Sequence, residues 1–138
     1  MNLATLIVEG DEVALGMIRK TLSLRTDTSW KKGDVGRNGK RHASSGFNAT
    51  IADVANPVEL ALAIRGFLKQ CKECGVVFSH AGVSAELSLG FTVGDSQQFV
   101  ASVELSPSDL SSLAEHGLTL SLTAYPTSDD ANAVQGAI

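Results

Sequence analysis

The sequence has few aromatic residues and few cysteines, and each shortage narrows the class of protein. Aromatic residues make up 5% of the 138 positions, with one Trp and one Tyr, so we expect an aliphatic core of Leu, Val, Ile and Ala. Two cysteines, Cys71 and Cys74, are too few for a secreted scaffold held by disulfides. With 43% hydrophobic and 19% charged residues, the chain is also too apolar to be disordered.

Long apolar runs and a signal peptide are missing as well. Polar or Gly residues interrupt every apolar stretch well before the ~20 residues that a membrane-spanning helix needs. The first residues, Met1 to Val8, lack the positive charge that begins a signal peptide. We therefore expect a cytoplasmic protein without a membrane partner.

Basic residues are absent from the second part of the chain. All eleven Lys and Arg lie between Arg19 and Lys72, whereas the residues from Glu73 onward include eight acids and contribute to a net charge of −4. Such asymmetry indicates charged partners. The alternative is that scattered acids only keep exposed positions solvated.

The first part of the chain predicts strands alternating with helices. Asp11 and Asn56 are helix N-caps, and Gly75 suits a left-handed C-cap. Between the two helices lies a polar, Gly-rich and basic excursion. The predicted elements are a strand over 3–9, a helix that follows Asp11, an irregular hairpin over 25–45 with edge pairing at 28–31 and a return strand over 42–51, and a helix from Pro57 to near Gly75.

The second part alternates apolar and polar residues with a period of two, which is typical of half-buried strands. The predicted elements are a strand over 83–93, a turn at 94–97, an antiparallel hairpin partner over 99–105, a short helix capped by Ser106, and a last strand over 118–126. We expect one domain over 1–126 and a loose tail over 127–138.

These elements indicate the α+β fold class. Strands with one polar face, joined by hairpin connections, favour a mainly antiparallel sheet with helices on one face. The predicted architecture is a two-layer sandwich of ferredoxin-like or related type.

Residues 29–34 read Ser-Trp-Lys-Lys-Gly-Asp. With the closing Gly-Leu step and a last strand that finishes in Tyr125, this segment resembles a bacterial family catalogued as domain of unknown function 4279. In that family Gly is usual where Ser23 stands, and Trp is usual where Phe47 stands. The resemblance spans nearly the whole chain and implies a domain type, without an activity.

Trp30 lies in the densest group of basic residues. An aromatic platform among cations suits a nucleotide or single-stranded nucleic acid. A lone Trp in an aromatic-poor chain is more often a core residue, and both interpretations stay open. The group comprises Trp30, Lys31, Lys32, Arg37, Lys40 and Arg41.

The sequence contains no recognisable catalytic or metal centre. Cys71 and Cys74 have the spacing of redox and zinc sites, but they lie at a helix C-terminus, where the dipole disfavours a thiolate. Zinc also needs two further ligands, so we expect ordinary buried thiols, no cofactor and no metal. No serine lies in a nucleophile-elbow motif, and an enzyme is not expected.

The leading hypothesis is a non-enzymatic protein-binding module, specifically an immunity or inhibitor protein that covers a basic toxin or nuclease with an acidic surface. The alternative is a nucleotide- or nucleic-acid-binding domain that uses the loop Trp30–Arg41, and a hydrolase or metal enzyme is a third class. Homodimerisation through a sheet edge is open. The predicted partner-binding residues are Glu86, Asp95, Glu104, Asp109 and Glu115.

Overall fold

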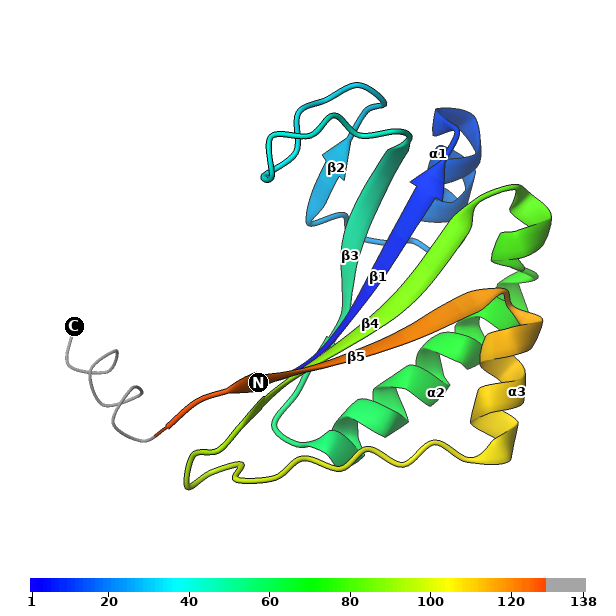
Figure 1. Ribbon diagram of the computed structural model, residues 1–138. Helices are drawn as coiled ribbons and strands as arrows, with labels where there is room; N and C mark the ends of the chain where they lie inside the picture. The colour runs from blue at the N-terminus through cyan, green and yellow to red at the C-terminus, as the bar shows by residue number, and fades with distance from the viewer. Residues whose placement is uncertain (129–138) are drawn as a thin grey trace.

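Five strands form one sheet, and the α-helices lie on one of its faces (Figure 1). The computed structural model describes residues 1–128. In chain order the elements are β1 (Asn2–Gly10), α1 (Glu12–Thr21), β2 (Thr28–Trp30), β3 (Ser45–Asp53), α2 (Pro57–Cys74), the 3-10 helix η1 (Phe78–Ala81), β4 (Ser84–Val93), α3 (Pro107–Glu115) and β5 (Leu118–Pro126). The predicted two-layer α+β sandwich is confirmed.

The strands follow the order β2-β3-β1-β4-β5 across the sheet. All neighbours are antiparallel except β4 and β5, which are parallel. The elements from β1 to β4 have the β-α-β-β-α-β order of a split crossover motif, and α3 then returns the chain to place β5 beside β4. The mainly antiparallel sheet is confirmed, while the finer ferredoxin-like assignment stays a prediction.

The predicted hairpin between 83–93 and 99–105 is wrong. Gly94 has a φ of 104° and Asp95 accepts hydrogen bonds from the backbone N–H groups of Gln97 and Gln98 (3.0 and 2.7 Å), so the chain turns away from β4. Residues 99–105, which we call the strap, start in a bend at 99–100 and then run without regular secondary structure along the helix side of the sheet to α3 (Figure 1). Their alternation arises because Ala101, Val103 and Leu105 pack against the core. The place beside β4 belongs to β5.

The helix ends follow the predicted capping chemistry. The side chains of Asp11 and Asn56 accept hydrogen bonds from first-turn N–H groups of α1 and α2, and Gly75 ends α2 with a φ of 69°. Ser106 begins α3 through a reciprocal capping box with Asp109. These local signals therefore placed all three α-helices correctly.

The core lies between the sheet and the helices. Leu6 and Val8 of β1 belong to the same buried cluster as Leu60 and Ile64 of α2, and all four are fully buried. The core is mainly aliphatic, as predicted, and four of the five phenylalanines are buried with it. These are Phe47, Phe67, Phe78 and Phe91.

The loop after β2 and the end of the chain were also predicted from the sequence. The irregular hairpin is present, since β2 pairs briefly with β3 and a single bridge joins Val35 to Arg41. At the other end, the N–H of Thr127 donates to the carbonyl of Val93 (2.8 Å), and the rest of the expected tail, residues 129–138, lies outside the described residues. Within residues 1–128, no helix is both long enough and apolar enough to span a membrane.

Candidate functional site: the open face of the sheet

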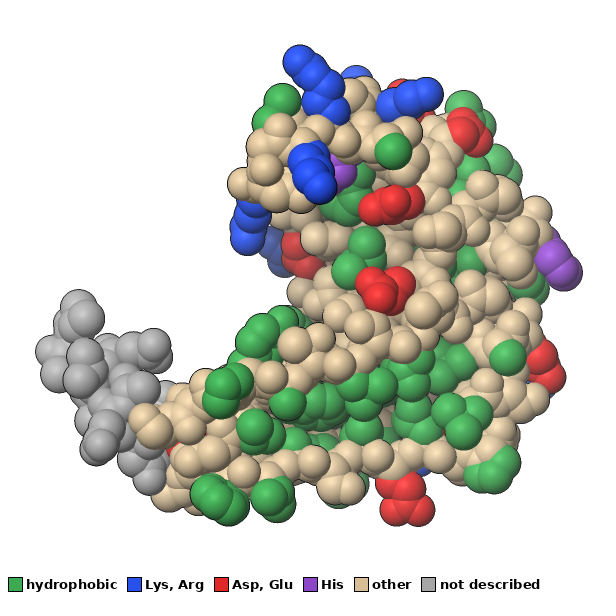
Figure 2. Space-filling view, viewed as in Figure 1, with side chains coloured by type: hydrophobic (Ala, Val, Ile, Leu, Met, Phe, Trp, Pro, Cys, Tyr) green, Lys and Arg blue, Asp and Glu red, His purple; other side chains and the backbone are tan. Residues whose placement is uncertain are grey.

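The sheet face opposite the helices is uncovered by the described residues, and we call it the open face. Its side chains alternate along each strand with buried ones such as Leu6 and Leu87. Figure 2 shows the molecule hollowed on this side, between the loop after β2 and the end of β5. The open face includes Leu3, Thr5, Ile7 and Glu9 of β1, Trp30 of β2, Gly46, Asn48 and Asp53 of β3, Glu86, Ser88 and Gly90 of β4, and Tyr125 of β5.

Two adjoining hollows run along the open face. One, of about 490 Å³, is lined by Leu3, Ile7 and Tyr125, among others. The other, of about 730 Å³, is lined by Ile7, Trp30 and the loop after β2. Because Ile7 lines both hollows, they form one shallow groove. Sites for small molecules enclose most of the ligand surface, whereas an open groove of this kind suits a protruding segment of another macromolecule.

The open face has negative charge and no cation on its strands. None of the five strands contains Lys or Arg. Their three acids, Glu9, Asp53 and Glu86, all lie on the open face, since their register partners include Gly46, Leu3 and Ile7 respectively. Glu9 accepts a hydrogen bond from the Ser44 hydroxyl (3.3 Å), and within residues 1–128 none of the three acids has an ion pair.

The Ser-Trp-Lys-Lys-Gly-Asp segment builds the wall at one end of the groove. The Asp34 carboxylate accepts a hydrogen bond from the backbone N–H of Lys31 (2.8 Å), and Gly33 takes a φ of 92° that favours glycine. The N–H of Lys32 donates to the Ser45 hydroxyl (3.0 Å). The motif residues thus close a tight turn and tie it to the start of β3.

Trp30 is held in place on three sides. Its indole N–H donates to the carbonyl of Ser44 (3.1 Å), and its ring stacks on His42 with centroids 4.9 Å apart. The ring also lies against the Cα of Gly46, where a Cβ would stand 2.4 Å from Cζ2. Trp30 is half-buried and does not belong to the main core. It is therefore a wall residue of the groove, with much of its ring already covered.

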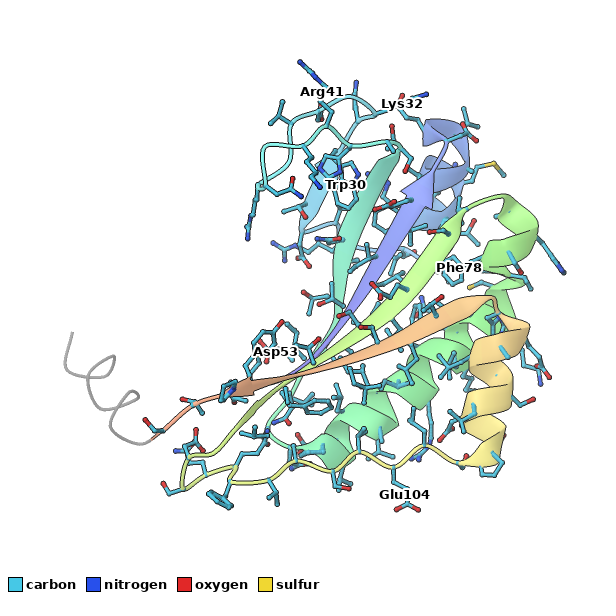
Figure 3. The ribbon with its side chains drawn as sticks, in the orientation of Figure 1. Trp30, Lys32, Arg41, Asp53, Phe78 and Glu104 are labelled. Atoms are coloured by element: carbon cyan, nitrogen blue, oxygen red, sulfur yellow. The ribbon has the colours of Figure 1, made fainter. Side chains whose placement is uncertain are left out.

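The five predicted cationic residues lie around this wall. All are exposed, and none forms a salt bridge in the described part of the chain. Arg41 donates to the carbonyl of Gly33 (2.8 Å). Figure 3 shows Lys32 and Arg41 at the same end of the molecule as Trp30. The cations are Lys31, Lys32, Arg37, Lys40 and Arg41.

The structure does not bring together the five acids predicted to bind a partner. Glu86 lies on the open face, whereas Glu104 is exposed on the strap (Figure 3) and Glu115 on α3. Asp95 and Asp109 are each only 7% exposed. The sequence reasoning missed Glu9 and Asp53, although their alternation with core residues along β1 and β3 places them opposite the helices.

Asp109 has a structural role. It accepts the backbone N–H of Ser106 (2.8 Å) and forms an ion pair with Arg65 of α2 through Nε (3.0 Å). Burial raises the pKa of this carboxyl, but the hydrogen bonds from Ser106 and Arg65 outweigh burial and hold its pKa below the ordinary value. Asp109 therefore joins α3 to α2.

The cysteines and histidines occupy separate environments. Cys71 is fully buried, and burial raises the pKa of its thiol to about 12, but Cys74 is exposed, so the expectation that both thiols are buried is wrong for Cys74. His116 is buried with Nδ1 2.7 Å from the carbonyl oxygen of Val76, while His80 is exposed. Among residues 1–128, no three His, Cys, Asp or Glu side chains cluster as metal ligands.

Comparison with known proteins adds no relative: no family model, no curated protein and no solved structure matches the chain. The carboxylates, hydroxyls and half-exposed apolar side chains of the open face are suited to contact and charge recognition across a broad surface.

Proposed function

We propose that this chain is a non-enzymatic protein-binding module whose open face receives a basic segment of a partner protein. The observation that carries the proposal is the charge of the sheet: three acids on the open face and no Lys or Arg in any strand. Complementary charge speeds docking and fixes its orientation. An ammonium or guanidinium group from the partner is the natural counterion for Glu86, which has no ion pair within residues 1–128.

Apolar contacts at the two ends of the groove complete the recognition surface. Trp30 lies at one end, and Tyr125, which is 50% exposed, lies at the other together with Met1. Binding energy in interfaces concentrates in residues such as Trp and Tyr. The acids between them provide specificity, so a partner needs both basic and apolar side chains on a projecting segment.

An immunity or inhibitor protein is the specific form of this function that we favour. Nucleases and many toxins act on anionic substrates through basic surfaces, and an acidic concave surface can cover such a region. The unpaired thiols of Cys71 and Cys74 suit the reducing cytoplasm, where an inhibitor of this type would act. The resemblance to the bacterial family of unknown function is compatible with this role.

Charge reversal on the open face tests the proposal. Tagged wild-type protein, Glu86→Lys and the matched control Glu104→Lys are incubated with cell lysate, and retained proteins are quantified at low and high salt. We expect one stoichiometric partner that wild type and Glu104→Lys retain, and whose affinity for Glu86→Lys falls by about tenfold or more. The isosteric Glu86→Gln separates loss of charge from any loss of folding.

Two results would contradict the proposal. Equal retention by Glu86→Lys and Glu104→Lys would show that the open face is not the contact surface. A retained partner whose binding segment is acidic would contradict the charge argument directly.

A second candidate function is binding of single-stranded nucleic acid by the loop Trp30–Arg41. The observation that favours it is the group of exposed cations beside the Trp30–His42 stack, none of which forms a salt bridge with any of residues 1–128. Binding should change Trp30 fluorescence, weaken steeply with salt and weaken further in Arg37→Glu. A constant signal during titration with oligonucleotides at low salt would exclude this function.

A further inference from the structure

The two edges of the sheet differ in how they are protected. β2, at one edge, has three residues and is flanked by charged Asp27 and Lys31. β5, at the other edge, has nine residues without a single charge. Proteins commonly protect exposed edges with short strands and charged side chains. The β2 edge has both protections, and the β5 edge has neither.

The leucine side chains on the helix side of β5 become more exposed toward the C-terminal end of the strand. Leu118, Leu120 and Leu122 all point toward the helix layer, yet Leu118 is buried, Leu120 is half-buried and Leu122 is 54% exposed. An apolar groove of about 400 Å³ lies between this end of β5 and the strap, and it is lined by Phe91, Val93, Ala101, Ser102, Val103, Leu122, Thr123 and Ala124. Figure 2 shows hydrophobic side chains gathered in this part of the molecule.

The outer edge of β5 is unpaired in the described residues. β5 pairs only with β4, and no backbone hydrogen bond joins it to the strap. An unpaired, uncharged edge beside an apolar groove combines two features of an interaction surface: free N–H and C=O groups, and hydrophobic side chains next to them.

We propose that β5 pairs antiparallel with β5 of a second copy of this chain, about a two-fold axis at Leu122. In this register Leu120 lies opposite Ala124 of the second copy, and Ser121 lies opposite Thr123. Apolar side chains then meet on the helix side and hydroxyl side chains meet on the open face. Such matched cross-strand pairs stabilise antiparallel sheets.

A second copy fits this edge because the interface is self-complementary. A two-fold interface uses the same surface on both subunits, and the uncharged strand places no like charges opposite one another. The antiparallel arrangement also sets the exposed end of β5 in one copy beside the covered beginning of β5 in the other. The two sheets become continuous with both open faces on one side, which provides a bivalent surface for a partner.

Solution oligomeric state tests this inference independently of the proposed partner. Sedimentation velocity of the full chain over a range of micromolar concentrations compares wild type with Leu122→Lys and with Leu62→Lys, a control on α2 that changes a leucine of similar exposure (58%). We expect a wild-type dimer that Leu62→Lys retains, and a dimer dissociation constant at least about tenfold higher in Leu122→Lys. Circular dichroism verifies that both variants are folded.

Crosslinking tests the register. In a Cys74→Ser background, Leu122→Cys lies on the two-fold axis and should form an intermolecular disulfide on mild oxidation, whereas Leu62→Cys should not. A wild-type protein that stays monomeric at every concentration would overturn the inference. A dimer unaffected by Leu122→Lys, or crosslinked equally through positions 62 and 122, would overturn it as well.

Discussion

Replacing Gly46 by Ala should destabilise the protein and displace Trp30. A Cβ at position 46 would lie 2.4 Å from Cζ2 of Trp30 and 2.7 Å from the backbone oxygen of Val8. The indole can move only by leaving His42 and the carbonyl of Ser44. The oxygen of Val8 cannot move without disturbing the pairing of β1 with β3, which lies in the middle of the sheet.

The expected loss follows from these contacts. Overpacking of this kind costs about 1–3 kcal/mol, and the lost indole hydrogen bond adds about 1 kcal/mol. We therefore expect Gly46→Ala to lower the free energy of unfolding by roughly 2–4 kcal/mol. Urea denaturation followed by fluorescence measures it cleanly, because Trp30 is the only tryptophan, and native emission should shift to the red.

Gly66→Ala is the matched control. Gly66 lies inside α2, and a Cβ there meets no atom within 4 Å. The same substitution should stabilise the protein by up to about 1 kcal/mol, because Ala is the better helix former. Unfolding of Gly46→Ala at the same urea concentration as wild type, with unchanged Trp30 emission, would contradict this prediction.

Three further predictions follow from single residues. Ser23 has a φ of 51°, a left-handed conformation that Gly adopts more easily. Ser23→Gly should therefore raise the urea midpoint and increase the free energy of unfolding by about 1 kcal/mol. An unchanged or lower midpoint would contradict this prediction. Asp109→Asn should lower the free energy of unfolding by about 1–2 kcal/mol at neutral pH. Ser106 and Arg65 lower the pKa of Asp109. The difference in free energy of unfolding between wild type and Asp109→Asn should therefore be complete above pH ~4 and shrink as the pH falls further. A difference that stays constant down to pH ~2 would count against an ionic contribution. In native protein a thiol reagent should label Cys74, while Cys71, whose pKa is about 12, should react only after unfolding; mass spectrometry of peptides distinguishes the two.

The resemblance gains a physical interpretation at position 23. Ser23 directly follows the C-cap of α1 and takes a left-handed conformation, which strongly favours Gly. Gly is also the residue that the resemblance predicted from the sequence implies at this position. At the second difference, Phe47 is buried on the helix side of β3, with the Arg19 guanidinium carbon 5.2 Å from its ring centroid. The two differences thus fall at a helix exit and in the core, away from the open face.

Local interactions explain which parts of the fold could be predicted from the sequence alone. A cap acts over three or four residues, so Asn56 and Ser106 were sufficient to place the starts of α2 and α3. Alternation along a strand depends only on which face is buried, so β1, β4 and β5 were recognisable. The same locality produced the error at the strap, because an extended segment lying on a core alternates like a paired strand.

Which strands are neighbours, and therefore which side chains share the open face, depends on contacts between distant parts of the chain. β5 reaches β4 through the crossover of α3, and no property of residues 99–105 alone reveals that their place in the sheet is taken. Glu9, Asp53 and Glu86 come from three different strands and share one face of the sheet because β1 lies between β3 and β4. Strand order is set by the packing of whole helices against the sheet, so a site that depends on that order cannot be seen in any single segment.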